Sequence, residues 1–386
     1  MERGPSGFPT PITSVGERCM AFMPKPLPPE PPLQWSDALH GVAQRAGVAL
    51  GRLSGVTGLL PDSQLFLYAY VRKEAVLSSQ IEGTQSSLSE LLLFENDAAI
   101  GAPLDDVVEV SNYVAAMEHG FKRMNEGIPL SLRLLREVHG VLLAKGRGSE
   151  KQPGEFRTSQ NWIGGSRPGN ALYVPPPPDQ LIECLGALEN FLHNPSVPPL
   201  VRAGLAHVQF ETIHPFLDGN GRTGRLLITL LLCHDGLLAQ PLLYLSLYLK
   251  KNRAAYYDLL QRVRTHGDWE AWLDFFLRGV EETANQATET ARRLIQLFQQ
   301  DRARLHAEGR KGLSALKLHE ILQKNPVITV PRLVAKFNFS APTANSALRL
   351  LVELGLVREI TGQKRHRVFA YQEYLRTLNE GTELPA

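Results

Sequence analysis

The chain of 386 residues is 43% hydrophobic and 21% charged, which is ordinary for a folded protein and excludes a disordered or collagen-like chain. The 41 Lys and Arg residues nearly balance the 39 Asp and Glu residues, so the net charge of +2 excludes a global attraction to nucleic acid or to an acidic membrane. Three cysteines, Cys19, Cys184 and Cys233, include no CxxC pair, which fits neither a disulfide framework nor a zinc finger and indicates a reducing cytoplasm.

The first residues are predicted to form a Pro-rich N-terminal arm (residues 1–35). Six prolines lie between Pro24 and Pro32, and proline favours extended polyproline II structure over helix. The chain does not open with a basic cluster followed by an apolar stretch, so no secretory signal is expected. The apolar run over residues 226–233 is too short to cross a bilayer. We therefore expect a cytoplasmic protein without a membrane partner.

Residues 36–110 are predicted to form an N-terminal helical region. Positions three or four apart make up one helix face: Leu65, Tyr68, Val71, Ala75, Ser78 and Glu82. Gly83 follows this face in the position of a C-terminal cap. Two more helices are predicted over residues 105–125 and 131–143, the second with a Ser at its N-cap.

Residues 111–300 are predicted to form a helical core that one β-hairpin interrupts. Short β-type runs over residues 161–163 and 171–174 lie among Gly, Pro and Asn residues, which is typical of a hairpin. The prolines of residues 175–178 end it, and Asp179 can cap the next helix. Later helices are predicted over residues 201–213, 222–233 and 269–305.

Residues 311–386 are predicted to form a winged-helix domain, because helix, short helix, turn, third helix and hairpin follow one another. The wing carries four basic residues and one acidic residue, which suits contact with DNA phosphates: Arg358, Lys364, Arg365, Arg367 and Glu359. The third helix, however, offers only Asn345, Ser346 and Arg349 for reading base edges. DNA binding and a protein-docking or dimerising role are therefore both open.

The segment HPFLDGNGRTGR, residues 214–225, carries the chemistry. It contains a GxGxxG pattern at Gly219, Gly221 and Gly224. A dinucleotide-binding fold is excluded, since the preceding residues are predicted to be helical and no carboxylate stands about 20 positions later. The glycines let backbone N–H groups turn inward at the start of a helix, which makes an anion site that suits phosphate.

Charged side chains surround this anion site. Arg222 and Arg225 lie on one face of the first helical turn, where cations oppose the helix dipole unless a polyanion binds. Asp218 supplies the oxygen ligand that Mg²⁺ prefers, and His214 has a side chain suited to proton abstraction near neutral pH. Together, the anion site, the two arginines, Asp218 and His214 predict phosphoryl or nucleotidyl transfer from a nucleoside triphosphate. The alternative, a Gly-rich helix start beside a buried His, leaves the joint occurrence of these groups unexplained.

The same twelve residues resemble the Fic-domain signature HxFx(D/E)GN(G/K)RxxR, and the resemblance extends over roughly residues 36–300. It implies adenylylation, in which a Ser, Thr or Tyr hydroxyl of a target protein attacks the α-phosphate of ATP and pyrophosphate leaves. It further implies His214 as the base, Asp218 as the Mg²⁺ ligand and Arg225 as the clamp on the γ-phosphate. The other implied nucleotide-binding residues are Gly219, Asn220, Gly221, Arg222, Thr223 and Gly224, whereas Phe216 packs.

Ser78, Glu82 and Gly83 match the inhibitory motif (S/T)xxxE(G/N) that one class of Fic proteins carries on a helix before the core. Ser78 and Glu82 lie four apart on one helix face. A carboxylate that reached Arg225 would take the place of the γ-phosphate. The alternative is an ordinary helix end with Glu82 in solvent.

Two further segments resemble Fic features. The hairpin over residues 161–174 is similar to the Fic flap, which implies that a protein substrate docks on it by strand addition; the alternative is a plain surface hairpin. Residues 248–257 resemble the NRxxYY stretch of the family, which makes Asn252 a candidate adenine or ribose contact. Tyr256 and Tyr257 are expected in the core.

We therefore expect a mainly α protein: a Fic-type helical bundle with a small β-hairpin flap, followed by a winged helix-turn-helix domain. Its expected activity is protein adenylylation with ATP and Mg²⁺, inhibited by Glu82. One alternative is removal of AMP from modified proteins, with Glu82 orienting a water. Another is a nucleotide-sensing, DNA-binding regulator, against which His214 argues because a sensor needs no base. A homodimer is also open.

Overall fold

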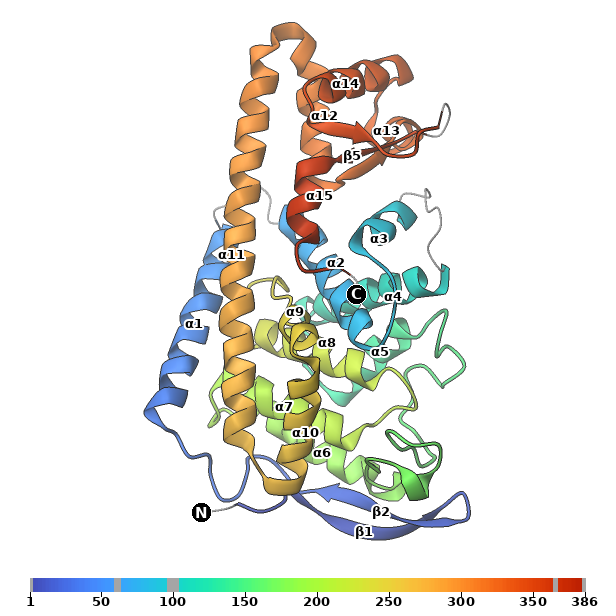
Figure 1. The fold of residues 1–386 in the computed structure, drawn as a ribbon, viewed down its shortest axis with the longest axis vertical. Helices are drawn as coiled ribbons and strands as arrows, with labels where there is room; N and C mark the ends of the chain where they lie inside the picture. The colour runs from blue at the N-terminus through green and yellow to red at the C-terminus, as the bar shows by residue number, and fades with distance from the viewer. Residues whose placement is uncertain (1–2, 59–63, 96–103, 364–366, 384–386) are drawn as a thin grey trace.

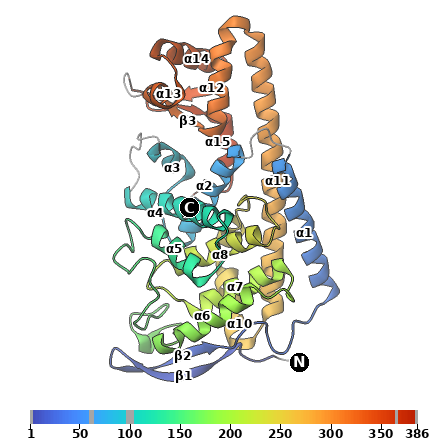
Figure 2. The same cartoon turned by 180° about the vertical axis from the view of Figure 1, so that it is seen from behind.

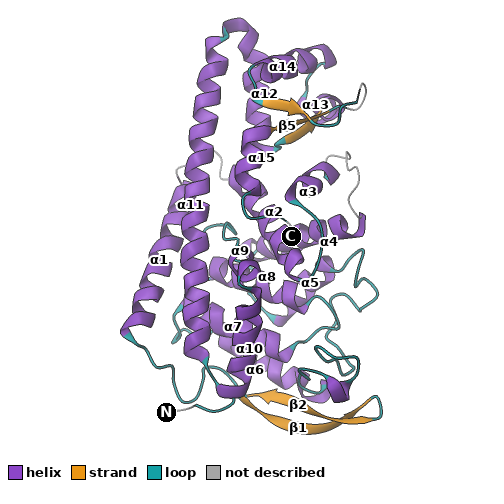
Figure 3. Ribbon diagram, viewed as in Figure 1, coloured by secondary structure: helices purple, strands orange, loops and turns teal. Residues whose placement is uncertain are grey.

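The computed structural model describes residues 3–58, 64–95, 104–363 and 367–383 (Figure 1). Helices dominate these residues, and two small antiparallel sheets lie at opposite ends of the molecule (Figure 3). The predicted mainly α fold is thus confirmed. None of the described helices combines the length and the apolar composition that crossing a bilayer requires.

One long helix, α11 (Trp269–Ala307), runs nearly the whole length of the molecule, and α1 (Asp37–Gly58) packs along it (Figures 1 and 2). Its 39 residues correspond to roughly 58 Å at 1.5 Å per residue. Buried side chains recur at intervals of three or four, among them Trp272, Phe276 and Val280. This stripe keeps one face of α11 against the bundle, while its far end carries the C-terminal domain.

Helix α7 (Pro199–Ile213) is the centre of the bundle. Every residue from Leu200 to Ile213 is buried, which is typical of a helix surrounded by others. Helix α7 packs against α11, α6 (Leu181–Leu192), α8 (Asn220–His234) and α10 (Arg253–His266). Around these helices lie α2 (Gln64–Ile81), α4 (Leu104–Asn125), α5 (Leu132–Leu142) and α9 (Ser246–Lys251). A short α3 (Leu88–Phe94) opens with a capping box of Ser87 and Glu90.

The prediction of polyproline II structure for the N-terminal arm is wrong for much of its length. Strands β1 (Gly7–Ser14) and β2 (Glu17–Pro24) form a hairpin with a tight turn at Val15 and Gly16, which both have positive φ. The hairpin tolerates Pro9 because this residue pairs with Phe22, whose N–H points away from β1 to the carbonyl of Val174, 2.9 Å away. A proline at such an outer-edge position removes no ladder hydrogen bond.

The predicted hairpin over residues 161–174 is only partly formed. Ile163 and Tyr173 make a single antiparallel bridge, and a short 3₁₀ turn, η1 (Pro168–Asn170), lies between them. Gly164 and Gly165 both have positive φ, so the chain leaves the extended conformation directly after the bridge. The segment rests on the N-terminal hairpin, where Glu17 accepts hydrogen bonds from Arg167 and from the Gly169 backbone.

The winged-helix order predicted for the last part is confirmed. After the 3₁₀ turn η3 (Gly309–Lys311), the elements are α12 (Gly312–Lys324), β3 (Val327–Thr329), α13 (Val330–Phe337), α14 (Ala341–Glu353), β4 (Val357–Glu359), β5 (Val368–Tyr371) and α15 (Gln372–Asn379). The predicted hairpin is formed by β4 and β5, and β3 pairs with the other edge of β5 to give a three-stranded sheet in the order β3-β5-β4. Two residues of the predicted basic wing, Lys364 and Arg365, lie outside the described residues.

Candidate active site

The loop over residues 214–219 turns the chain from α7 into α8. His214 caps α7 in the left-handed conformation, with φ 50° and ψ 61°, and its N–H donates to the Phe210 carbonyl at 2.9 Å. Gly219 has φ 73° and begins α8. A non-glycine residue in the left-handed region is strained and persists only where its surroundings hold it, so the position of His214 is a first indication of function.

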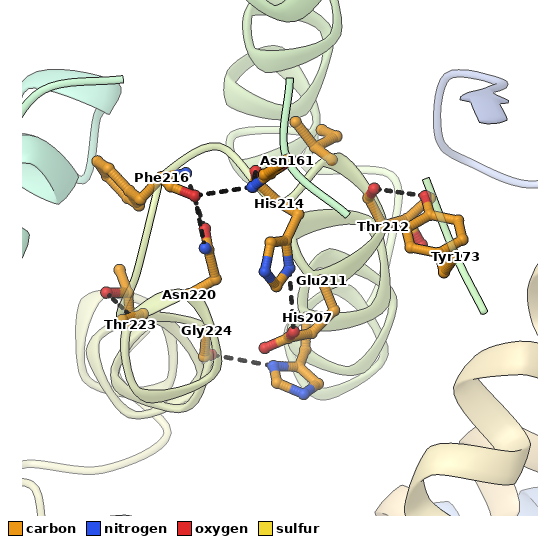
Figure 4. A network of polar contacts seen from close by, with 12 residues as sticks. Asn161, Tyr173, His207, Glu211, Thr212, His214, Phe216, Asn220, Thr223 and Gly224 are labelled. Atoms are coloured by element: carbon orange, nitrogen blue, oxygen red, sulfur yellow. Dashed lines mark hydrogen bonds and ion pairs between the residues drawn. The ribbon is translucent and has the colours of Figure 1, made fainter. Parts of the chain in front are cut away.

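Side-chain contacts fix the shape of this loop (Figure 4). The Asn220 side chain accepts from the Phe216 N–H and donates to the Phe216 carbonyl, each at 2.8 Å. Asn161 also donates to the Phe216 carbonyl at 3.0 Å, and the Phe216 ring stacks on His139 with 3.6 Å between centroids. The Asn220 side chain therefore shapes the loop, and backbone N–H groups are left to face an anion.

His214 is held as a neutral imidazole. The guanidinium of Arg157 donates to the His214 carbonyl at 2.9 Å. Burial, followed by the charges of Arg264 and Arg157, lowers the pKa of His214 to about 3. At neutral pH the ring carries no charge, so it is able to accept a proton.

The start of α8 forms an open anion cradle. The Asp218 carboxylate accepts from the Gly219 N–H at 2.6 Å and keeps about a third of its surface exposed. Thr223 is buried and donates back to the Gly219 carbonyl at 2.9 Å. A Cβ at Gly221 would lie 2.3 Å from a carboxylate oxygen of Glu82, so a larger residue there would displace that side chain.

Both arginines of the predicted site are buried beside carboxylates. Arg222 is 3% exposed and pairs with Glu109 of α4 at 2.9 Å. Arg225 is 2% exposed and donates to Glu82 at 2.7 Å and to the Ser78 hydroxyl at 2.8 Å. The structure thus joins Ser78 of α2 and Glu82, directly after α2, to Arg225 at the end of the predicted phosphate-binding motif.

Glu82 and Arg225 hold each other in the charged form. Burial opposes the ionisation of Glu82, but the charge and hydrogen bond of Arg225 outweigh it and lower the pKa of the carboxyl. Burial likewise opposes the charge on Arg225, and Glu82 raises its pKa above the ordinary value. Gly83, with φ 98°, then ends the helix, and Thr84 donates to Glu109 at 3.0 Å. Residues 82–84 therefore include Glu82, the partner of Arg225, and contact Glu109, the partner of Arg222.

Asn252 lies between α9 and α10, and its side chain donates to the Tyr248 carbonyl at 3.0 Å. The prediction that both tyrosines of the NRxxYY stretch are in the core is half wrong. Tyr256 is 1% exposed and bonds to His207 at 2.8 Å, but Tyr257 is 42% exposed. Adjacent positions on a helix differ by 100°, so one of the pair turns outward.

Sequence reasoning missed several residues that hold the site: Glu109, His139, Arg157, Asn161 and Glu211. Most of them contact the motif across 50 residues or more of chain, and no local pattern marks them. Glu211 alone lies close in sequence, one helical turn before His214, where a carboxylate beside a predicted base was a signal to follow.

The residues of the site suit Mg²⁺ only together with the phosphates of a bound nucleotide. Within the described ranges, no group of three or more His, Cys, Asp or Glu residues could hold a metal ion by itself. Mg²⁺ is commonly bound through one or two carboxylates together with substrate phosphates. The lone, partly exposed Asp218 beside the anion cradle fits that pattern.

Comparison with known sequences matches three parts of the chain. Residues 41–122 match the family model described as Fic/DOC family N-terminal, and residues 129–232 match that of the Fic/DOC family. Residues 314–358 match the model described as winged helix-turn-helix DNA-binding.

The chain is also similar to named proteins. It is 32% identical over 209 residues to a protein adenylyltransferase Fic of Aedes aegypti, covering 53% of this chain and 39% of the relative. It is 31% identical over 251 residues to a protein of the same name from Culex quinquefasciatus, covering 61% of this chain and 47% of the relative. The chain thus spans less than half the length of these two curated relatives.

Among solved structures, a Fic family protein from Desulfovibrio desulfuricans G20 is similar with a TM-score of 0.57 and 20% identity. The match covers 88% of this chain and 98% of that one, so the two share a fold. The family models thus identify residues 41–122 and 129–232 as similar to the two parts of the Fic/DOC family, and residues 314–358 as similar to a winged helix-turn-helix domain.

Proposed function

We propose that this chain is a protein adenylyltransferase that transfers AMP from ATP to a Ser, Thr or Tyr hydroxyl of a target protein and is inhibited by its own Glu82. The observation that carries the proposal is the Glu82 carboxylate, which lies 2.7 Å from Arg225 at the open start of α8. A buried arginine that already holds an anion is suited to hold a phosphate in its place. The names of the curated relatives support the same reaction.

The chemistry follows from the positions of the site residues. ATP would bind with its phosphates against the backbone N–H groups of Asn220 and Gly221, while Arg222 and Arg225 balance the negative charge. His214, neutral at pH 7, would accept the proton of the attacking hydroxyl. Asp218 would hold Mg²⁺, whose positive charge would stabilise the phosphate oxygens.

Inhibition follows from charge and space. Glu82 fills the space that the missing Cβ of Gly221 leaves open, and it neutralises Arg225. A triphosphate that reached Arg225 would meet this carboxylate, and the like charges would repel. ATP would then bind in an unproductive position until α2 moves. The reverse reaction, removal of AMP, is not favoured, because the relatives are named for the forward transfer.

We propose that the protein substrate docks on residues 161–174. The exposed Leu172, at 82%, offers an apolar contact on this flap. One side of the segment is already in use, because the carbonyl of Val174 accepts from Phe22 of the N-terminal hairpin. A target segment would therefore have to approach from the other side.

A second function, DNA binding by the winged helix, is favoured by the family match of residues 314–358 and by the exposed polar face of α14. Asn345, Ser346 and Arg349 are all exposed there.

We propose a cytoplasmic location because the three cysteines, Cys19, Cys184 and Cys233, are free thiols. A homodimer stays a prediction that a mass measurement in solution would check.

The position of the transferred label tests the reaction itself. The Glu82→Gly variant is incubated with Mg²⁺ and ATP labelled on either the α- or the γ-phosphate, with Glu82→Gly/His214→Ala as the control. We expect the α label on the protein, no γ label, and no transfer in the control. Retention of the γ label would mean phosphorylation, and loss of both labels would contradict the proposal.

A further inference from the structure

A buried carboxylate outside the signature faces the proposed base. Glu211 lies on the last turn of α7 and is 7% exposed. Its Oε2 is 4.0 Å from Nδ1 of His214 (Figure 4). Neither Oε1 of Glu211 nor Nδ1 of His214 makes a hydrogen bond of good geometry to any residue that the structure describes. Two buried and complementary polar groups therefore face each other just beyond hydrogen-bond distance.

The neighbouring helix is shaped to admit this carboxylate. A Cβ at Gly224 of α8 would lie 2.6 Å from Oε1 of Glu211, so any larger residue would displace the side chain. His207, one turn earlier on α7, contacts the carbonyl of Gly224 at 3.0 Å and so ties the two helices together. Gly224 thus has a role in addition to the one that the signature implies, since it leaves room for Glu211.

Burial of a carboxylate requires a compensating partner. Among the described residues, His214 is the ionisable base within 4.0 Å of Glu211, whereas Arg225 and Arg264 act on it from farther away. A purely structural carboxylate would be expected to hydrogen-bond with both oxygens. The pairing of an unsatisfied acid with an unsatisfied imidazole is the arrangement by which a carboxylate orients a catalytic histidine.

We propose that Glu211 is a positioning residue for His214, accepting a hydrogen bond from its Nδ1–H so that the unprotonated Nε2 faces the attacking hydroxyl. The inference rests on the proposed adenylyl transfer. A shift of a few tenths of an ångström to one ångström brings the two groups into hydrogen-bond distance, and such bonds commonly tighten only when substrate binds.

The proton balance of the step is complete. The hydroxyl oxygen of the target forms a bond to the α-phosphorus of ATP, and the bond from that phosphorus to the pyrophosphate oxygen breaks. The hydroxyl proton passes to Nε2 of His214, and pyrophosphate leaves with the electron pair. The imidazolium that forms keeps its proton on Nδ1, where the Glu211 carboxylate stabilises the new positive charge.

The charges around Glu211 link this role to inhibition. Burial raises the pKa of Glu211 to about 7, Arg225 of α8 and Arg264 of α10 lower it, and Glu82 of α2 raises it. When Glu82 moves away, the repulsion between the two carboxylates falls, and Glu211 is more readily ionised. An ionised carboxylate beside His214 would favour the protonated form of the imidazole. Glu82 itself also favours the protonated imidazole, so its departure acts on His214 in both directions.

The backbone of Glu211, rather than its side chain, is the alternative partner of the His214 ring. The backbone carbonyl of Glu211 also faces the imidazole and favours its protonated form. If this carbonyl alone held Nδ1, the side chain of Glu211 would be dispensable. Side-chain substitutions leave the carbonyl in place and therefore distinguish the two.

The test uses the full chain with Glu82→Gly as the parent. Glu211→Gln removes the charge and keeps the shape, Glu211→Leu removes the acceptor as well, and Glu183→Gln is a control on the exposed face of α6. Self-adenylylation is measured against ATP concentration and pH. We expect kcat to fall about 10-fold with Gln and about 100-fold with Leu, with the KM for ATP unchanged and the acid limb of the pH profile moved to lower pH. Glu183→Gln should match the parent.

A second measurement does not need activity. The ¹⁵N shifts of histidine, with the His214 signal assigned by its loss in His214→Ala, report which ring nitrogen carries the proton at pH 7.5. We expect Nδ1–H in the parent and a mixture of tautomers in Glu211→Leu. The same tautomer in both, or a kcat within about threefold of the parent, would overturn the proposal. If the parent transfers no AMP, the proposed function fails, and the tautomer alone decides on Glu211.

Discussion

At the scale of single residues, the site depends on buried charges held by one or two neighbours each. Arg225 has two such neighbours on α2, because Ser78 accepts at 2.8 Å and Glu82 at 2.7 Å. Ser79 stands beside Ser78 and is also buried, but its hydroxyl makes no hydrogen bond to any residue in the described part of the chain. Adjacent serines thus provide a matched pair for testing whether the inhibitory contact depends on hydrogen bonds to Arg225.

We expect Ser78→Ala to weaken the inhibitory contact and Ser79→Ala to leave it intact. Loss of the Ser78 hydroxyl leaves the Nε of a buried arginine without an acceptor, which costs about 1 to 3 kcal/mol in the free energy of unfolding. AMP transfer should rise in Ser78→Ala, although less than in Glu82→Gly. Urea unfolding and self-adenylylation of the two variants check this. Equal behaviour of both serine variants would show that Ser78 does not hold Arg225.

The sequence allowed residues within one motif to be predicted far better than contacts between motifs. The roles implied for His214, Asp218 and Arg225 depend on spacing within a single turn and helix start, which local geometry determines. The contact of Arg222 with Glu109 joins residues more than 100 positions apart, and no pattern in either segment names the other. Glu82 was linked to Arg225 only because a known family carries the same short motif.

At the scale of secondary-structure elements, α2, which leads directly into Glu82, is braced by the end of the chain. Lys73 of α2 donates to the Glu380 carbonyl at 2.6 Å, and Gln80 donates to the Thr382 carbonyl at 3.1 Å. Arg293 of α11 forms a two-pronged pair with the Glu380 carboxylate at 2.8 Å. The segment after α15 therefore lies against the helix that presents Glu82.

Removal of residues 379–386 should release part of the inhibition. Without these residues, Lys73 loses its bond to the Glu380 carbonyl and Gln80 keeps only its bond to the Ser86 carbonyl, so α2 loses support on one side. We expect AMP transfer by the otherwise unchanged protein to rise several-fold, and Arg293→Ala to have a smaller effect in the same direction. Arg376→Ala, which breaks only an exposed pair with Glu373, is the control. Transfer equal to that of the full chain would contradict the role of this segment.

The winged-helix domain contains a buried imidazole whose stability contribution depends on pH. His319 of α12 contacts the Tyr371 hydroxyl at 3.1 Å, and burial, followed by the charge of Arg302, lowers its pKa to about 4. Since the unfolded chain, with a histidine pKa of about 6.5, binds more protons between these values, this term stabilises the fold at pH 7 and is lost as pH falls from about 6.5 to 4.

We expect the destabilisation caused by His319→Gln to be smaller at pH 5 than at pH 7, by about 2 kcal/mol. The estimate follows from the 1.5 pH units that separate pH 5 from the unfolded value of about 6.5. Urea unfolding of both proteins at both pH values gives the double difference. A difference that does not change with pH would mean that His319 is not buried in its neutral form.

Secondary structure was predictable where apolar residues recur with a helical period, and less so where proline and glycine dominate. The helices of the bundle and the order of the winged helix follow from periodicity. The hairpin of β1 and β2 was missed because its prolines, such as Pro9, stand at outer-edge positions that composition does not distinguish. The flap residues form only the bridge between Ile163 and Tyr173, because left-handed glycines follow at once.

At the scale of the whole molecule, α11 joins the helical bundle to a winged helix that is packed against it. Arg332 of α13 donates to the Glu95 carbonyl next to α3 at 2.7 Å, and Asp301 of α11 accepts from Tyr371 of β5 at 2.6 Å. Figure 1 shows α14 at the outer end of the molecule, away from the body. The helix expected to read DNA is therefore accessible, while the opposite side of the domain contacts the region that carries α2 and α3.

If this domain binds DNA, affinity for a duplex should fall steeply with salt, because the contacts expected are mainly to phosphates. Arg349→Ala and Arg358→Ala each remove an exposed cation, on α14 and on β4. We expect each to reduce the slope of log Kd against log salt by about one. The absence of duplex binding at about 50 mM salt would instead favour a protein-docking role for the domain.

Three residues from distant parts of the chain are proposed to act on one reaction. Glu82, directly after α2, contacts Arg225 of α8, and His214 lies between α7 and α8. In the proposed scheme Glu82 blocks Arg225, and His214 is the base. Variation of the blocking residue and the base in one protein therefore tests the complete scheme.

The most direct measurement is the intact mass after incubation with Mg²⁺ and ATP, for the wild-type protein, Glu82→Gly and Glu82→Gly/His214→Ala. The account predicts added AMP on Glu82→Gly, little on the wild-type protein and none on the double variant. Equal modification of the wild-type protein and Glu82→Gly would contradict inhibition by Glu82. Modification of the double variant would contradict His214 as the base.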